Sequence, residues 1–594
     1  MPPPPHLPSF VEGDGDGDGG HPTSRAGEQV SSSSYSSLSS QLDQNIGVGT
    51  DSSSAQAVGV NQSSSLSVAS EEKSAREEDA KPKKTGGDFK GGANDDDEEE
   101  EEGEGEGGVK TATTTAAATT TAAATTTRHW QAGGKLAVTT TKEWFDILLD
   151  DPKNRLALSA LTQANPLFIL SSRSARINTG QHVFNTAIPL EGSPVANQRQ
   201  SGRCWLFAAA NCFRVKLMQK HNVEKFEFSQ GYLFFWDKLE KCNWFLEQII
   251  STALDGDGDE DEAHTEQGRL VQWMMREPLS DGGQWDMVCN LVEKYGLVPQ
   301  GLYPDSWSAR GSKWLNGIVL TKLREDALRL RELAREGKEG EGVGRVKEGM
   351  VRELFAILTL TLGVPPGVDE EFEWCFKDKG GKVKSVKATP RGFARDNVFD
   401  GKEEALRDMI SLVNDPRNEY MSLLTVDRLG NVVGGREVTY VNVEMGVLKD
   451  ACVAMLRDGV PVFFGSDVGK FCDRESGIMD VELVDYELGF NVSLLGMNKA
   501  ERLRTGESLM THAMVLTGVH VDEGTEKPVR WRVQNSWGEG SGEMGWFVMS
   551  DGWMGEFVYQ AVVESRFVGK EVRDVLAKGE KKVLPLWDPM GSLA

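Results

Sequence analysis

The chain has 594 residues, of which 39% are hydrophobic and 26% charged, and its 91 acidic against 65 basic side chains give a formal net charge of −26. It contains no stripe of lysine and arginine, and no apolar run approaches the roughly 20 residues of a membrane-spanning helix. Its seven cysteines include no C-x-x-C pair and are too few for a disulfide scaffold at this length. These features argue against a nucleic-acid-binding, membrane-embedded or disulfide-rich secreted protein, and they favour a reducing compartment.

The first part of the sequence, residues 1–138, is of low complexity. It contains alternating Asp and Gly near its start, a serine tract from Ser31, an acidic run at 95–102 and a Thr/Ala tract at 111–127. Because large hydrophobic residues are scarce here, burial cannot offset the conformational entropy of ordering the chain. We therefore predict a disordered tail over residues 1–138.

The opening of this tail bears on the cellular location. MPPPPHLPSF has no charged segment followed by an apolar stretch, and acidic residues from Glu12 onward precede Arg25, the first Lys or Arg. The opening therefore matches neither a secretory signal nor an Arg-rich mitochondrial presequence. We expect a cytoplasmic protein and leave a mitochondrial pool open.

Beyond residue 138, the pattern of hydrophobic residues changes along the chain from helical to strand-like. Helices are predicted at 143–149, 204–218, 228–250, 322–335 and 350–360, with a Gly-, Glu- and Lys-rich surface loop at 336–348. Strands are predicted at 421–426, 438–443, 460–464, 513–521, 530–533 and 546–549. Helices first and strands afterwards indicate an α+β fold, in contrast to alternating βαβ units.

One cysteine stands where a nucleophile is expected, in the segment NQRQSGRCWLFA. Cys204 directly precedes an apolar, alanine-rich stretch without Gly or Pro, so it is predicted to open a buried helix. The free N–H groups and the positive dipole end of a helix N-terminus favour the thiolate, which is the form that attacks carbonyl carbon atoms. Gln198 lies six residues earlier in a turn, and its amide could bind an oxyanion together with the backbone N–H of Cys204. The plainer alternative is a buried structural cysteine.

A thiol nucleophile needs an imidazole as its base, and His512 has the best sequence context of the eight histidines. It stands at the entry to the predicted strand 513–521, where its side chain can project into a cleft. Asn535 closes the next predicted strand and can orient the imidazole through its side-chain carbonyl, while Trp537 can shield that hydrogen bond from water. Each residue alone fits a structural role, but in the order Gln, Cys, His and Asn they form a nucleophile, a base and an orienting group.

These four residues, in this order, resemble the catalytic set of the papain superfamily, and the surrounding sequence is similar to its bleomycin hydrolase branch. The resemblance is carried by NQRQSGRCWLFAAAN, FSQGYLFFWDKLEKCNWF, DGGQWDMVCNLVEKYG, GMNKAERLRTGESLMTHAMVLTGV, QNSWGE and LPLWDPMGSLA. It extends from about residue 142 to residue 594 and leaves residues 1–138 without a counterpart.

The resemblance implies a papain-like fold with a helical left domain, a β-rich right domain and additional helical and lid insertions. It implies one peptidase domain at 139–594, in which the insertions account for the long separation of Cys204 from His512. The expected parts are a Cys-bearing helical half at about 180–300, insertions at about 300–430, a His- and Asn-bearing β half at about 435–565 and a C-terminal tail at 566–594.

The same resemblance implies an intracellular cysteine aminopeptidase that removes N-terminal residues from peptides one at a time. Hydrolysis of the amide in bleomycin and of homocysteine thiolactone are further implied activities. The resemblance also implies a homohexamer whose active sites face an inner chamber, with peptides as partners and with no metal or organic cofactor.

The C-terminal residues LPLWDPMGSLA carry Trp587, Met590 and Leu593 with two prolines, whereas a typical chain end is polar and frays. Resemblance to the family implies that this tail docks in the active-site cleft. The carboxylate of Ala594 would then meet the α-ammonium group of the substrate, and the bulk of the tail would exclude longer upstream chain. The alternative is an apolar tail that packs at a subunit interface.

Two other functions stay open on the sequence alone. A papain-like endopeptidase would usually carry a secretory signal, a propeptide and disulfides, none of which is evident in the sequence. A catalytically silent scaffold that recruits partners through an acidic tail would be favoured by a lost Cys or His, whereas Cys204 and His512 are both present.

Overall fold

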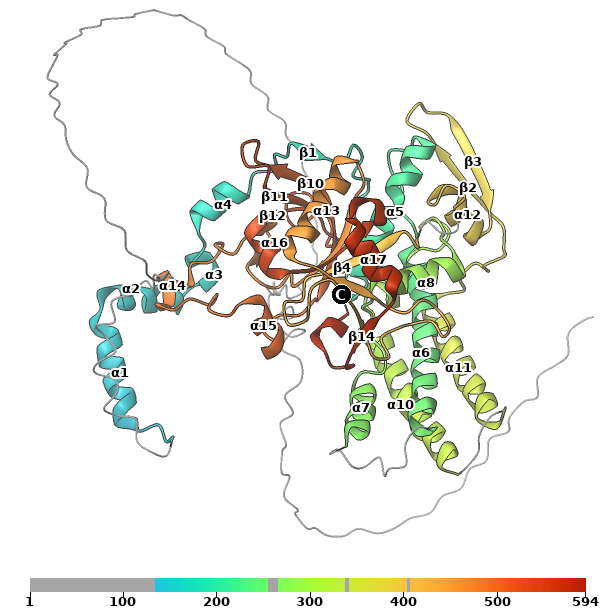
Figure 1. Cartoon of the computed structure of the whole chain (residues 1–594), viewed down its shortest axis with the longest axis horizontal. Coiled ribbons are helices and arrows are strands. Elements are labelled where there is room, and N and C mark those ends of the chain that lie inside the picture. Colours follow the sequence, from blue (N-terminus) through green and yellow to red (C-terminus); the bar gives the residue numbers. More distant parts are fainter. Residues whose placement is uncertain (1–133, 255–264, 337–340, 403–405, 594) are drawn as a thin grey trace, which may run out of the picture. The chain divides into compact units, whose positions relative to one another are not determined.

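The computed structural model describes residues 134–254, 265–336, 341–402 and 406–593 (Figure 1). The predicted disordered tail therefore lies outside the described residues up to position 133. Within the described part, helices dominate the first half and strands dominate the second, which agrees with the predicted α+β class. No helix in this part has both the length and the apolar character that crossing a bilayer would require.

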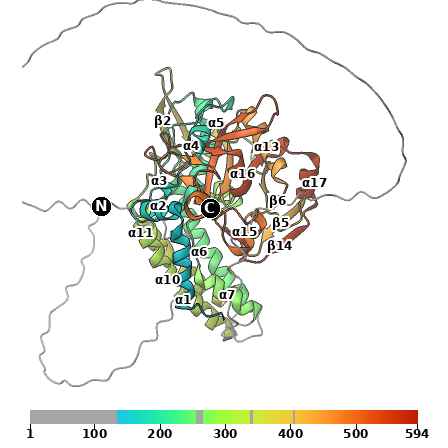
Figure 2. The ribbon, with the colours of Figure 1, turned by 90° about the vertical axis from the view of Figure 1, so that its left-hand side faces the viewer.

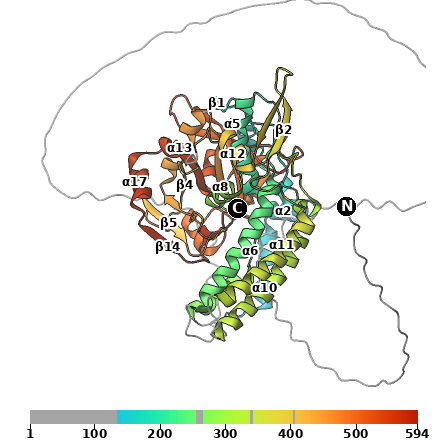
Figure 3. The same ribbon diagram turned by 90° about the vertical axis from the view of Figure 1, so that its right-hand side faces the viewer.

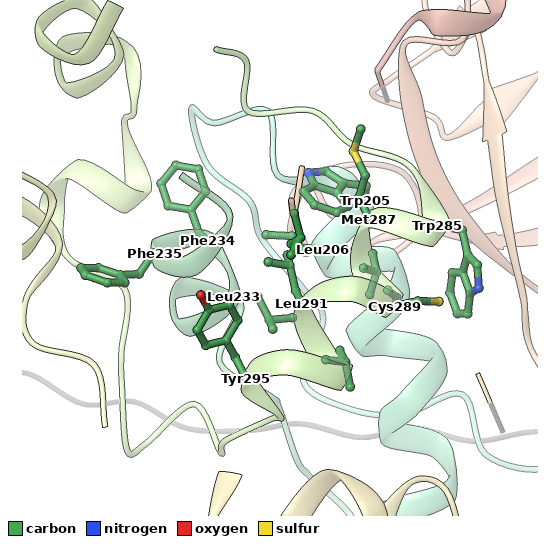
Figure 4. Close-up of a cluster of buried hydrophobic side chains, with 14 of the residues drawn as sticks. Trp205, Leu206, Leu233, Phe234, Phe235, Trp285, Met287, Cys289, Leu291 and Tyr295 are labelled. Carbon is green, nitrogen blue, oxygen red and sulfur yellow. The ribbon is translucent and has the colours of Figure 1, made fainter. Parts of the chain in front are cut away.

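Three helices build the core of the helical half: α5 (Cys204–His221), α6 (Gln230–Leu254) and α8 (Trp285–Tyr295). The first two match the helices predicted at 204–218 and 228–250. Large side chains from all three meet in the cluster of Figure 4, which contains Trp205, Leu206, Leu233, Phe234, Phe235, Trp285, Met287, Cys289, Leu291 and Tyr295. Each such side chain contributes about 1.5–3 kcal/mol when it is fully buried. The cluster therefore fixes the position of α5 and of the cysteine at its start.

Two long helices, α10 (Lys313–Arg335) and α11 (Glu341–Leu362), pack along α6 as a three-helix bundle (Figures 1 and 3). The predicted surface loop at 336–348 is wrong over most of its length, because α11 already begins at Glu341. Glycines in this segment disfavour a helix. Burial of apolar residues at helical spacing outweighs that cost, and these residues are Val343, Met350, Leu354 and Leu358.

Shorter elements complete the helical half. They are α7 (Glu266–Arg276), α9 (Trp307–Arg310), α12 (Pro390–Asn397) and an antiparallel hairpin of β2 (Phe372–Lys377) and β3 (Val383–Ala388). The hairpin was not predicted. It covers the end of α5 through Trp374, whose ring centroid lies 5.5 Å from that of His221 and 5.0 Å from that of Phe226.

Strands of the described chain form one twelve-stranded sheet in the order β14, β5, β6, β4, β13, β7, β10, β11, β12, β9 and β8, with β1 paired to β10. The bounds are β1 (Thr186–Ala187), β4 (Met409–Val413), β5 (Ser422–Val426), β6 (Tyr440–Asn442), β7 (Val462–Ser466), β8 (Cys472–Asp473), β9 (Ile478–Met479), β10 (His512–Val521), β11 (Pro528–Gln534), β12 (Trp546–Ser550), β13 (Val558–Glu564) and β14 (Lys581–Leu584). All six predicted strands are present, as β5, β6, β7, β10, β11 and β12. The strands β4, β13 and β14 were not predicted.

The two faces of this sheet bury different helices. Alternate residues of β10 show this, because side chains along a strand point to opposite faces. Ala513 and Val515 belong to the same buried cluster as α5, whereas Met514 and Leu516 belong to the cluster that contains α13 (Met445–Arg457). The sheet thus lies between α5 on one face and α13 on the other.

Further helices surround the sheet and its edge. They are α14 (Tyr486–Phe490), α15 (Lys499–Thr505), α16 (Asp551–Phe557), α17 (Lys570–Lys578) and the 3-10 turns η2 (Ser565–Phe567) and η3 (Pro589–Gly591). In Figure 2, α17 lies beside β5, β6 and β14, and β14 pairs in parallel with β5. The chain after β14 then turns back toward the helical half through η3.

The first described helices form an arm with much exposed apolar surface. They are α1 (Val138–Asp150), α2 (Pro152–Leu161), α3 (Pro166–Ile169) and α4 (Arg173–Thr179). α2 contacts α14, and α4 contacts β9 and β12. Large hydrophobic side chains of the arm that are more than half exposed include Phe145, Ile147, Leu156, Leu167 and Phe168. Apolar surface gathered in this way is typical of an interaction site.

Candidate active site

The segment before α5 is held against the segment after β11 by backbone contacts. The Gln198 N–H donates to the Ser536 carbonyl at 2.8 Å, and Asn197 forms an antiparallel bridge with Trp537. The turn before α5 and the segment after β11 therefore lie side by side. This contact brings the candidate cysteine and glutamine close to the candidate asparagine and tryptophan.

Cys204 is the first residue of α5, as predicted, and it is buried. Burial raises the pKa of its thiol to about 11, against the lowering effect of hydrogen bonds from the backbone N–H groups of Ala513 and Trp205. Desolvation therefore outweighs the N–H donors at the helix terminus, and the thiol needs the base that the sequence predicts to take its proton. Because Ala513 directly follows His512, the same contact brings the sulfur beside the strand that carries the candidate base.

His512 and Asn535 are hydrogen-bonded to each other, with 2.9 Å between Nε2 and Oδ1, and both side chains are buried. An amide oxygen can only accept, so the bond assigns the imidazole proton to Nε2 and gives Nδ1 of the neutral ring the acceptor lone pair. The Trp537 ring lies 4.9 Å from the imidazole, centroid to centroid, at an angle of 33°. The ring is thus a neighbour of the imidazole, and its shielding of the hydrogen bond stays a prediction.

Gln198 is oriented by two hydrogen bonds of its side chain. Its Nε2 donates to the Ser201 carbonyl at 2.7 Å, and its Oε1 accepts from the Ser536 hydroxyl at 2.6 Å. The first bond holds the amide in the turn that leads to Cys204, and Nε2 carries a second N–H. The described contacts of this amide are with the turn and with Ser536, and none is with the sulfur itself.

Asp281, a buried carboxylate that the sequence analysis did not single out, supports the same turn. It accepts a hydrogen bond of 3.1 Å from the Gly202 N–H, and Lys238 Nζ lies 2.5 Å from its other oxygen. Burial alone would raise the pKa of Asp281, but the Lys238 charge and hydrogen bonds from Ser312 and Asn316 hold it well below its usual range. The only signal in the sequence was its place in the phrase DGGQW.

Arg203 supports the other flank of the nucleophile candidate. Its guanidinium is fully buried and binds Asp305 through two hydrogen bonds of 2.8 Å each. A bidentate pair of this kind restricts both partners in orientation. The residue before Cys204 is therefore fixed by an ion pair that the sequence analysis also missed.

The C-terminal tail enters the same region. Gln284 Nε2 donates to the Ser592 carbonyl at 2.7 Å, and the Ser592 hydroxyl donates to the Met510 carbonyl at 2.8 Å. Leu593 is partly buried against the core of the helical half. Ala594, the predicted contact for the substrate amine, lies outside the described residues.

Together these groups have the composition of an acyl-transfer site with a thiol nucleophile, an oriented imidazole and amide donors. No group of three or more His, Cys, Asp or Glu side chains arranged to hold a metal ion occurs in the described part of the chain. The seven cysteines all lie in that part, and all are free.

The chain matches the model of the Peptidase C1-like family over residues 135–591. It is 44% identical to bleomycin hydrolase of Rattus norvegicus and 43% identical to that of Homo sapiens, in each case over 454 residues that cover 75% of this chain and 96% of the relative. It is 41% identical over 463 residues to "Cysteine proteinase 1, mitochondrial" of Saccharomyces cerevisiae, covering 77% of this chain and 92% of that protein.

Among solved structures, the crystal structure of PepW from Lactobacillus rhamnosis HN001 matches with a TM-score of 0.73 at 37% identity, covering 78% of this chain and 100% of that one. The predicted papain-like fold is thereby confirmed. By the extent of the family match and the identity to these relatives, the chain is a cysteine-type peptidase and belongs to the bleomycin hydrolase family.

Proposed function

We propose that the protein is an aminopeptidase, which removes residues one at a time from the free N-termini of peptides. The observation that carries the proposal is the position of the tail, because Ser592 is hydrogen-bonded both to Gln284 of the helical half and to Met510, two residues before His512. A segment in this place occupies space that the upstream part of a long substrate would need. Only a substrate whose N-terminus lies next to the nucleophile can then bind.

In the proposed reaction, His512 first takes the proton of Cys204, since burial raises the pKa of the thiol to about 11 and a neutral thiol is a poor nucleophile. The thiolate attacks the first peptide carbonyl, and the Cys204 N–H and the Gln198 side chain bind the oxyanion. His512, oriented by Asn535, then protonates the leaving amine. Water activated by His512 finally releases the N-terminal residue from the thioester.

Two further residues have supporting roles in this proposal. Trp537 keeps water away from the bond between His512 and Asn535, which its position 4.9 Å from the imidazole supports. The carboxylate of Ala594 pairs with the substrate α-ammonium group through a charge-assisted contact. The partly buried position of Leu593, the preceding residue, supports this role.

The same chemistry extends to other acyl compounds. The rat and human relatives are named bleomycin hydrolase, which supports hydrolysis of the bleomycin amide by this chain as well. A thiolate that forms a thioester also suits an activated thiolactone, so we include homocysteine thiolactone as a substrate. The nucleophile, base and oxyanion donors of this scheme are all side chains or backbone groups of the protein, and it uses no cofactor.

We further propose that the protein assembles as a homohexamer in the cytoplasm. The exposed apolar side chains of the arm α1–α4 support self-association, because monomers rarely expose contiguous apolar surface of this kind. The seven free cysteines support a reducing compartment. Light scattering of the purified protein tests the assembly, and a monomer in solution would contradict it.

Two alternatives differ from this proposal in their products. An endopeptidase would cut inside a peptide, and a silent scaffold would cut nothing. The tail, hydrogen-bonded to Gln284 and to Met510 near His512, disfavours the first. The buried pair of His512 and Asn535 disfavours the second, because a scaffold gains no function from an oriented imidazole.

Removal of Leu593 and Ala594 tests the proposal. We expect the truncated enzyme to lose activity on peptides with a free amine and to begin cleaving N-acetylated peptides. Substituting Cys204→Ala in the truncated chain is the control, since it shows that new cleavage uses the same nucleophile. A truncated enzyme that still demands a free amine, with unchanged kinetics, would contradict the proposed role of the tail.

A further inference from the structure

Gln284 is a residue of the helical half that is hydrogen-bonded to the C-terminal tail, and Arg269 of the same half stacks on Trp587 of the tail. Its Nε2 donates a 2.7 Å hydrogen bond to the carbonyl of Ser592, which lies 308 residues further along the chain. Gln284 stands at the N-cap position of α8, where a polar side chain often caps its own helix, yet it forms no such bond. Its amide is therefore directed to the tail, in place of the local helix end.

The backbone of Gln284 is fixed relative to Cys204. Trp205, the next residue after the nucleophile candidate, donates from Nε1 to the Asp281 carbonyl at 2.7 Å. Gly283 lies so close to the Trp205 ring that an added Cβ would be 2.6 Å from ring atoms, so no side chain fits there. The loop that carries Gln284 is thus packed directly on the first turn of α5.

The other bond of the tail leads to the segment of the base. The Ser592 hydroxyl donates to the carbonyl of Met510, and Met510 is buried two residues before His512. The side chain of Met510 packs over Gly465, and its Sδ lies only 2.2 Å from where a Cβ on Gly465 would stand. Ser592 is therefore connected by one hydrogen bond to the loop that packs on α5 and by one to the segment that leads to His512.

A further observation separates this role from a contribution to stability. Oε1 of Gln284 is buried and has no hydrogen-bond partner among the described residues. An unpaired buried acceptor is destabilising by about 1–3 kcal/mol, which offsets the stability that the donor bond to Ser592 contributes. The donor bond to Ser592 is what a glutamine provides at this position and a leucine cannot.

From this geometry we infer that Gln284 is a positioning residue for the C-terminal tail. Through its bond to Ser592 it sets how far the tail reaches into the cleft, and the position of the tail imposes the requirement for a free substrate amine. The inference rests on the aminopeptidase function proposed above. Gln284 acts on the tail and not on the scissile carbonyl. Its loss should therefore weaken the binding of peptides with a free amine more than it slows their conversion.

The test compares a peptide with its N-acetylated twin as substrates of full-length variants. Gln284→Leu keeps the bulk and removes the donor, so we expect the kcat/KM ratio of acetylated to free peptide to rise about tenfold, the effect of one lost hydrogen bond. The KM for the free peptide should rise more than kcat falls. Gln230→Leu is the matched control, because Gln230 is a fully buried glutamine at the start of α6 whose amide oxygen is likewise unpartnered in the described part.

A raised ratio in Gln284→Leu and an unchanged ratio in Gln230→Leu support the inference. In the chain that lacks Leu593 and Ala594, Gln284→Leu should not change the ratio of acetylated to free peptide any further, because the tail it positions is already shortened. A merely structural role of Gln284 would instead lower the activity equally in the full-length and the truncated chain. If truncation relaxes the requirement for a free amine and Gln284→Leu does not, the inference is wrong and the proposed function stands. If neither change relaxes it, the tail mechanism and the inference both fail.

A second variant keeps the test decisive should Gln284→Leu fail to fold. Gln284→Met also removes the donor to the Ser592 carbonyl, but it keeps an unbranched side chain of similar length. We expect it to raise the same ratio in the same direction. An unchanged ratio in Gln284→Met, in an enzyme whose truncated form does accept acetylated peptides, overturns the inference.

Discussion

His512 and Asn535 are joined by a hydrogen bond of 2.9 Å between Nε2 and Oδ1, although 23 residues separate them in the sequence. They meet because β10 and β11 are antiparallel neighbours, with His512 opening the first strand and Asn535 following the second. The Ser536 N–H donates a second bond of 2.7 Å to the same oxygen. The orientation of the imidazole is therefore set by the fold before any substrate binds.

Substitution of these two residues should have unequal effects on catalysis. We expect His512→Ala to lower kcat/KM by about 10²–10⁴-fold, the usual contribution of a general acid–base group. Asn535→Ala should cost less, since packing against Trp537 still restrains the ring. Steady-state kinetics of N-terminal residue release measures both. A loss in Asn535→Ala as large as that in His512→Ala, at unchanged thermal stability, would show that Asn535 does more than orient the base.

The seven cysteines should differ in their rates of alkylation. Burial raises the pKa of the Cys204 thiol to about 11, and it raises those of Cys242 and Cys472 to about 12. Proton transfer to His512 would further favour the thiolate at Cys204 alone, so iodoacetamide should modify Cys204 ahead of the other six.

Peptide mapping after brief labelling measures the order of modification. Cys375 in β2 is exposed, so iodoacetamide can reach it whatever its reactivity. A Cys375→Ser variant removes this background labelling. First modification of Cys212 or Cys472 would make the nucleophile assignment wrong. Loss of preferential labelling in His512→Ala is the accompanying expectation, since the imidazole supplies the base.

Lys499 should make stability depend on pH. Its Nζ donates to the carbonyls of Gly555 and Val558 at 3.2 and 2.5 Å, and burial lowers its pKa to about 7. Between pH 7 and the unfolded value of about 10.4, the unfolded chain binds more protons at this amine than the folded chain. Stability therefore rises with pH across this window, by about 1.4 kcal/mol per pH unit at most. Below pH 7 the amine is protonated in both states, and the full cost of burying its charge is present.

The corresponding measurement compares the wild type with Lys499→Met. We expect the unfolding midpoint of the wild type to rise between about pH 6.5 and 8.5 relative to that of the variant, because the variant has no amine to titrate. Comparing the two proteins cancels the titration of all other groups. Parallel pH profiles would mean that Lys499 keeps an ordinary pKa in the folded protein.

Much of the fold could be predicted because its local patterns are strong. The helix that starts at Cys204 follows from an apolar stretch without Gly or Pro, and the strand that starts at His512 follows from a run of β-branched and apolar residues. The central strand β13 was missed because it is buried on both faces, so its sequence VYQAVVE lacks the alternation that identifies a half-exposed strand. The start of α11 was missed because its glycines are typical of a loop. The burial of Val343, which favours the helix there, is a tertiary contact that the local sequence does not show.

The sequence predicted the candidate nucleophile, base and orienting residue, but not the buried ion pairs and hydrogen bonds that hold the neighbouring segments in place. Asp281 and Arg203 act through partners that are distant in sequence, and no local pattern reveals such pairs. The contact of Gln284 with Ser592 likewise exists only because the tail returns to the helical half. The raised pKa of Cys204 is also a tertiary effect, since the sequence shows the helix end but not the burial that opposes it.

The most direct test of the account follows an unlabelled peptide and its N-acetylated twin by mass spectrometry over time. With wild-type enzyme we expect the free peptide to lose one N-terminal residue after another while the acetylated twin stays intact, and with Cys204→Ala we expect neither peptide to change. Internal fragments, or cleavage of the acetylated twin, would contradict the aminopeptidase account and identify an endopeptidase. Intact peptides in every reaction would contradict it in favour of a silent scaffold.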